Sequence, residues 1–138
     1  MTSTGSAGIR QYQEINTQST LADATPHRLI QLLMERALMK MGLAKGHMER
    51  EEVREKGNNL GVAISIISML QASLNHKANA RMSANFDELY GYMMRRLLEA
   101  NLRNDSKIID EVSGLLQELK SAWDAITDQV DGEAAPAF

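Results

Sequence analysis

The sequence predicts an all-α protein, an antiparallel four-helix bundle with a short, loosely ordered N-terminal arm. Four segments place apolar residues at helical spacing, and none shows the alternation typical of a strand. Only two prolines occur, Pro26 and Pro136, so the middle of the chain lacks the strongest helix breaker. Short connections imply antiparallel neighbours. The expected organisation is an arm at 1–24, a helical bundle at 25–130 and a disordered tail at 131–138.

The N-terminal arm is rich in Ser, Thr, Gly and Gln, a composition that favours loose structure. Three apolar residues, Ile9, Tyr12 and Ile15, recur within it at a spacing of three. This pattern fits either a flexible tail or a short amphipathic turn that docks on the bundle.

The first helix is expected at 26–45. Thr25 is a good N-cap, and Pro26 suits the first helical position. Gly46 is a plausible C-cap. The predicted core face consists of Ile30, Leu33, Met34, Ala37, Met41 and Ala44.

The second helix is expected at 50–75. Two glycines inside it, Gly57 and Gly61, each cost about 1 kcal/mol relative to alanine, which weakens the early part. The following stretch NHKANARMSAN has no clear period and is expected to be a loop. The main apolar stripe of this helix comprises Val53, Leu60, Ala63, Ile64, Ile67, Leu70 and Leu74.

The third helix is expected to start near Asn85, a good N-cap, and to end at Asn104, which tolerates a left-handed turn. Asp105 can then cap the fourth helix. The stripe of the third helix is Phe86, Leu89, Tyr90, Met93, Met94 and Leu97. That of the fourth is Ile108, Ile109, Val112, Leu115, Leu116, Leu119, Trp123 and Ile126.

The first three helices carry more apolar residues than one core face needs. Those opposite the main stripes or on their shoulders are Leu32, Met39, Leu43, Val62, Ile66, Met69, Leu98 and Leu102. Either these helices are central and buried on two sides, or the surplus lines a groove for an amphipathic helix. Nine methionines modestly favour a groove because methionine adapts to irregular partners, although it is also an ordinary core filler.

Composition and motifs argue against several classes of function. The chain has no cysteine and a formal net charge of −3, so it lacks both thiol chemistry and the basic surplus typical of nucleic-acid binding. No apolar run is long enough to cross a membrane. The three histidines, His27, His47 and His76, lack the pairing that helical metal sites use, and they stand near expected helix ends rather than mid-helix, where a phosphotransfer histidine belongs. We therefore expect no metal and no cofactor.

The segment RRLLEANLRND, residues 95–105, places a polar face beside the third apolar stripe. Arg95, Arg96, Glu99 and Arg103 share that face at spacings that allow ion pairs. It therefore favours a solvated helix side over a phosphate-binding track. Asn101 lies on the apolar stripe, so we expect it to face inward and to be hydrogen-bonded.

Five motifs in order carry a family resemblance: GIRQYQ, TPHRLIQLL, AISIISML, ELYGYMMRRLLEANLRND and IDEVSGLLQELKSAW. Over residues 8–127 the chain resembles the flagellin-specific export chaperones of bacterial flagella, the FliS family. The resemblance implies a small cytosolic helical bundle, without enzymatic activity, that binds the disordered C-terminal region of flagellin. Such binding prevents premature polymerisation and keeps flagellin competent for type III export.

Two positions depart from the family pattern. The first helix has Leu33-Met34-Glu35-Arg36 where the family commonly has Leu-Tyr/Phe-Asp-Gly, which removes a glycine that would allow close helix approach. Gly91 replaces an aspartate common between the two tyrosines of the third helix, which removes a charge and weakens the helix locally.

The surplus apolar residues and the resemblance together identify a candidate client surface. In the family, Ile9 and Tyr12 belong to an N-terminal segment that packs near this surface. The expected partners are the flagellin C-terminal region and, as an additional candidate, a component of the export gate. A signalling or nucleic-acid-binding bundle remains the alternative. The candidate partner-binding residues are Ile9, Tyr12, Leu32, Val62, Ile66, Met69, Leu98 and Leu102.

Overall fold

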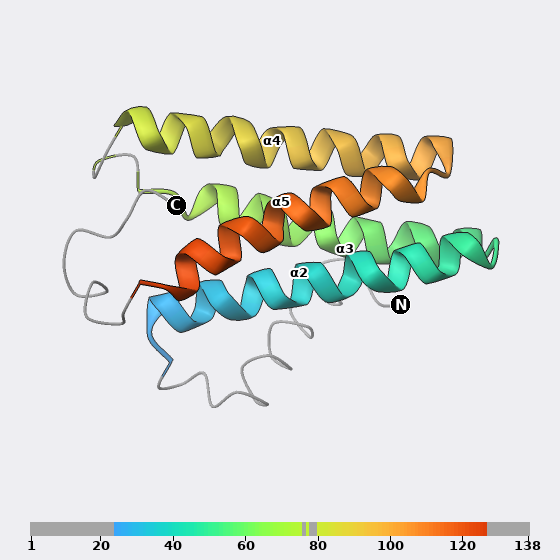
Figure 1. The fold of residues 1–138 in the computed structure, drawn as a ribbon, viewed down its shortest axis with the longest axis horizontal. Helices are drawn as coiled ribbons and strands as arrows, with labels where there is room; N and C mark the ends of the chain where they lie inside the picture. Colours follow the sequence, from blue (N-terminus) through green and yellow to red (C-terminus); the bar gives the residue numbers. More distant parts are fainter. Residues whose placement is uncertain (1–23, 76, 78–79, 127–138) are drawn as a thin grey trace, which may run out of the picture.

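The computed structural model describes residues 24–75, 77 and 80–126, and there the chain forms four α-helices and no strand. They are α2 (Pro26–Glu49), α3 (Val53–Ala72), α4 (Ala80–Arg103) and α5 (Ser106–Asp124). Consecutive helices run in opposite directions, with the α2–α3 and α4–α5 turns at one end of the bundle (Figure 1). Each helix packs along two neighbours, in the cyclic order α2, α3, α4, α5. The predicted four-helix bundle is confirmed.

Three of the predicted helix ends are formed by the capping residues expected from the sequence. The Thr25 hydroxyl accepts a hydrogen bond from the Arg28 amide at 3.1 Å, and Pro26 opens α2. Asn104 ends α4 with a φ of 54°, and the Asp105 carboxylate caps α5 by accepting from the Lys107 amide at 3.0 Å.

Other boundaries differ from the sequence prediction. Gly46 is not a C-cap: α2 continues to Glu49, because one further turn buries Met48 in the core. The reversal instead uses Glu51, whose φ is 58°. Likewise α4 starts at Ala80 rather than near Asn85, although its first turn is mostly exposed and therefore has no apolar period. Only Ser83 of that turn is buried, with its hydroxyl donating to the Ala80 carbonyl at 3.2 Å.

The core is apolar and draws on all four helices. Its largest fully buried side chains include Met34, Leu60, Tyr90, Leu97 and Ile109. At the end of the bundle away from the two turns, the His27 ring stacks on Trp123 with centroids 4.8 Å apart. His27 Nε2 lies 2.8 Å from the Trp123 carbonyl, and Trp123 Nε1 donates to the His27 carbonyl at 2.9 Å. This pair fastens the start of α2 to the end of α5, and its burial leaves His27 unsuited to phosphotransfer.

Candidate partner-binding surface

The structure describes six of the predicted surface residues and divides them into three groups, exposed, half-buried and buried. Met69, Leu98 and Leu102 are exposed, and Leu102 reaches 87% exposure. Leu32 and Val62 are half-buried. Ile9 and Tyr12, like most of the expected arm and all of the expected tail, lie outside the described residues. Ile66 was wrong as a surface candidate: it is only 3% exposed and belongs to the core, because α2 packs over that flank of α3.

Four further exposed apolar residues were not among the predicted binding residues: Met39, Leu43, Val53 and Met82. Met39 and Leu43 carried a detectable signal, since both lie opposite the apolar stripe of α2. Val53 has the spacing of the core stripe of α3, but it is the first residue of the helix and is 69% exposed. Met82 lies in the segment expected to be a loop.

The first group of exposed apolar side chains lies on the outer face of α2 and on the neighbouring flank of α3. Lys45 of α2 turns toward α5, where its Nζ donates to Asp110 at 2.8 Å. Met39 is six residues earlier, about 120° around the helix from Lys45 and almost opposite the buried stripe, so it lies on the outer face of α2. On α3, Gln71 turns toward α4 and Met69 lies about 200° away from it. We call this set the α2–α3 ridge; it consists of Leu32, Met39, Leu43, Val62 and Met69.

The second group lies on the flank between α3 and α4. Gln71 of α3 faces Gly91 of α4, and Leu98 stands seven residues after Gly91, which is almost two full turns. Val53 stands 18 residues before Gln71, about five turns, so it faces the same flank. We call Val53, Leu98 and Leu102 the α3–α4 ridge. It ends at the interhelical turns, whereas the α2–α3 ridge continues further along the bundle.

The outer face of α3 separates the two ridges. It carries Gly61, Ser65 and Ser68, all exposed and all small. A Cβ added at Gly61 would meet nothing within 4 Å among the described residues. The small side chains therefore leave space close to the α3 backbone between the two ridges.

A buried lysine supports the α3–α4 ridge from below. Lys56 is 5% exposed, and its Nζ donates to the Asn101 carbonyl at 3.1 Å and to the Asn104 side chain at 3.0 Å. These acceptors lie at the C-terminal end of α4, where a cation also complements the helix dipole. The inward orientation expected for Asn101 is wrong: its side chain is exposed, because Lys56 occupies the space beneath that turn. Lys56 shares core spacing with Leu60 and Ile67, a signal that could have revealed it.

The polar side chains of α4 form ion pairs with one another and with Glu111 of α5. Glu111 accepts from the Tyr92 hydroxyl at 2.5 Å and from Arg96 Nε at 2.9 Å. Arg96 and Arg103 both donate to Glu99, at 2.7 and 2.8 Å. The hydrogen bond from Tyr92, followed by that from Arg96, lowers the pKa of Glu111 below its ordinary value. Because these two arginines are committed to carboxylates, the face offers a poor phosphate track.

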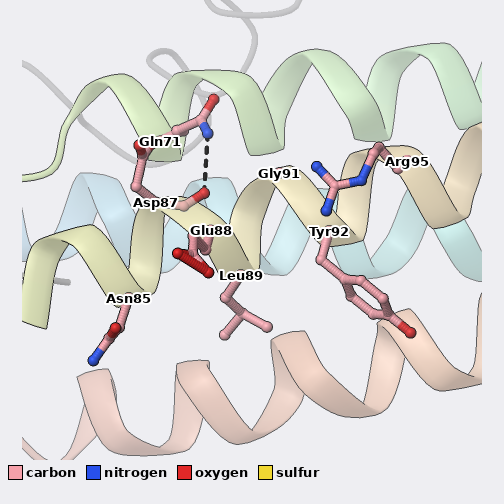
Figure 2. Close-up of a pocket in the computed structure, with 8 residues that line it drawn as sticks. All are labelled: Gln71, Asn85, Asp87, Glu88, Leu89, Gly91, Tyr92 and Arg95. Carbon is pink, nitrogen blue, oxygen red and sulfur yellow. Dashed lines mark hydrogen bonds between the residues drawn. The ribbon is translucent and has the colours of Figure 1, made fainter.

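An open depression of about 670 Å³ lies on the outer side of α4. Figure 2 shows Gln71 of α3 reaching the Asp87 carbonyl, whereas Leu89 and Tyr92 turn toward α5. The lining mixes acidic side chains with one arginine, and its one hydroxyl, that of Tyr92, donates to Glu111, which raises the pKa of Tyr92 above its ordinary value. The residues are Gln71, Asn85, Asp87, Glu88, Leu89, Gly91, Tyr92 and Arg95. Within the described ranges, no three His, Cys, Asp or Glu side chains gather as metal ligands.

None of the described helices combines the length and the apolarity that crossing a membrane requires.

Known proteins are similar to this sequence over most of its length. The family described as "Flagellar protein FliS" matches residues 8–130. A relative from Pseudomonas aeruginosa, "Flagellar secretion chaperone FliSB", is 47% identical over 119 residues, 86% of this chain and 94% of its own. "Flagellar secretion chaperone FliS" of Salmonella typhimurium is 40% identical over 122 residues, 88% of this chain and 90% of its own. The protein of the same name from Bacillus subtilis is 35% identical over 106 residues, covering 77% and 78%. The match over nearly the whole bundle, together with the four-helix fold, shows that the chain belongs to the FliS family of flagellar secretion chaperones.

Proposed function

We propose that this chain is a cytosolic export chaperone that binds the disordered C-terminal region of flagellin. Binding would prevent premature polymerisation and keep the subunit competent for flagellar type III export. One observation carries the proposal: exposed apolar side chains gather in two ridges on a bundle whose core is already complete. Apolar groups left outside a finished core mark a surface for a partner. Its relatives are named flagellar secretion chaperones, which supports the flagellar role.

The ridges suit a partner that becomes helical on binding. An amphipathic helix places its apolar side chains into a groove at spacings of three and four residues, as the ridges require. The small face of α3 permits close approach of that helix. A disordered client must be ordered during binding, so affinity is modest for the area covered. Modest affinity suits a complex that must later release its client to a component of the export gate.

The N-terminal arm supplies a second element of the proposal. We place Ile9 and Tyr12 over part of the client surface when flagellin is absent. Deleting residues 1–18 should then leave helicity unchanged and alter the affinity for a flagellin C-terminal peptide. Collapse of helicity after the deletion would instead make the arm part of the core.

Co-purification tests the proposed function directly. The chain should retain full-length flagellin and lose flagellin that lacks its C-terminal segment. Calorimetry with a peptide of that segment should give a negative heat-capacity change, because binding buries apolar surface. Retention of RNA with failure to retain flagellin would favour the nucleic-acid-binding alternative.

Substitution of the α3–α4 ridge gives a sharper test. Leu98→Asp with Leu102→Asp should weaken peptide binding at least about tenfold, since two apolar contacts become charged. Both leucines are exposed, so the fold should persist, although the unfolding midpoint should fall slightly because an aspartate near the end of α4 opposes the helix dipole. Gln117→Asp on the exposed face of α5 adds charge away from both ridges and is the control. Equal affinity in the ridge variant and the control would contradict the proposed surface.

A further inference from the structure

The methionines of the described bundle fall into two classes of access. Met34, Met41, Met48 and Met93 are buried in the core, and Met94 is partly buried. The Met41 sulfur also accepts a hydrogen bond from the Ser113 hydroxyl at 3.7 Å. Met39, Met69 and Met82 expose 49%, 45% and 43% of their surface. An oxidant in solution therefore reaches the three exposed thioethers before it reaches the buried ones.

Two of the exposed methionines lie on the same binding surface. Met39 and Met69 both belong to the α2–α3 ridge, one from each helix, while Met82 lies in the first turn of α4. The sequence has no cysteine, so these thioethers are the accessible sulfur groups of the described bundle. Oxidation would thus act on the ridge without a competing thiol.

We propose that Met39 and Met69 are sites of reversible oxidation that weakens client binding, an inference that rests on the proposed function. The oxidant is hydrogen peroxide. The thioether sulfur attacks one peroxide oxygen, an S–O bond forms, the O–O bond breaks, and the remaining oxygen leaves as water after proton transfer. Sulfur loses two electrons and peroxide gains them. Methionine sulfoxide reductases can reverse the change.

Oxidation of these methionines weakens client binding because the side chain becomes polar, and not because the bundle unfolds. A sulfoxide is polar, so it forfeits the apolar contact that a flexible methionine makes with an irregular partner. At both positions the sulfoxide oxygen can point into water in the free chain. The core methionines remain thioethers, so the helices stay packed. Oxidation therefore lowers affinity while leaving the fold intact.

Peptide mapping by mass spectrometry tests the selectivity. The full chain is treated briefly with hydrogen peroxide, quenched and digested. Met39, Met69 and Met82 should be oxidised well before Met34 and Met41, with the circular dichroism spectrum unchanged. Equal oxidation of core and surface methionines, or loss of helicity at the same rate, would overturn the proposal.

Binding measurements with the oxidant removed test the effect on the ridge. A flagellin C-terminal peptide free of methionine should bind the oxidised chain about tenfold more weakly than the untreated chain. Met39→Leu with Met69→Leu should abolish this loss, and Met82→Leu should not. If the oxidised chain binds the peptide as tightly as the untreated chain, the proposed regulation by oxidation is wrong, whereas the proposed function stands. Absence of binding before oxidation overturns the proposed function, and the regulation with it.

Discussion

Replacing Lys56 by methionine should destabilise the bundle through the last turn of α4. Methionine keeps most of the apolar stem and removes the ammonium group, so the Asn101 carbonyl and the Asn104 side chain lose their shared donor. A hydrogen bond from a charged group contributes about 1.5–3 kcal/mol, which puts the gross loss near 3–6 kcal/mol for two bonds. Both asparagines are exposed and can bind water instead, and the variant no longer buries a charge. We therefore expect a net loss of about 2 kcal/mol.

Urea denaturation followed by far-ultraviolet circular dichroism measures this loss, and the thermal midpoint should fall by roughly 8 °C. Lys45→Met is the matched control, because the Lys45–Asp110 ion pair is on the surface and should not measurably change the midpoint. Asn104→Gly, alone and combined with Lys56→Met, completes a cycle that should show a coupling of about 1 kcal/mol. A loss below about 0.5 kcal/mol for Lys56→Met would refute the assigned role of Lys56.

Three further predictions concern other parts of the bundle. The pKa of Glu111 is lower in the folded chain than in the unfolded chain, where it is about 4.3. The carboxylate therefore stabilises the fold above that unfolded pKa, and this contribution is lost as the pH falls through the folded pKa. In Glu111→Gln, the free energy of unfolding should fall less steeply as the solution is acidified. Gly114→Ala in α5, where a Cβ meets nothing within 4 Å among the described residues, should raise the free energy of unfolding by about 0.5–1 kcal/mol in urea titrations. Trp123→Phe removes the indole donor to the His27 carbonyl and part of the ring stack, so thermal unfolding should show a loss of about 2 kcal/mol, and an unchanged midpoint would contradict the fastening role of this pair.

Much of the bundle could be predicted from the sequence because its signals are local. Apolar residues at helical spacing determine which stripe faces inward, and Met34, Leu60, Leu97 and Ile109 are all buried as their positions predict. Caps act within one turn, which is why Thr25 and Asp105 were identifiable. The five ordered motifs indicate the family for a similar reason, since each is a short run of neighbouring residues.

The candidate surface was harder to predict because exposure at the edge of a stripe depends on the neighbouring helix. Ile66 and Met69 lie on the same flank of α3, yet α2 covers Ile66 and leaves Met69 in solvent. A helical wheel contains no information on where the neighbouring helix crosses. Val53 shows the converse, since a residue at core spacing is exposed when its helix begins there.

The four helices of the described residues, the main core stripes, two helix starts and the family were all predictable from the sequence, since each depends on residues near one another in the chain. Which surplus apolar residues form the two ridges, and the burial of Lys56 beneath the end of α4, became visible only in the folded bundle. The fold also joins Glu111 to Tyr92 and Arg96 across two helices. These features depend on groups far apart in sequence, whose meeting is set by how the helices pack.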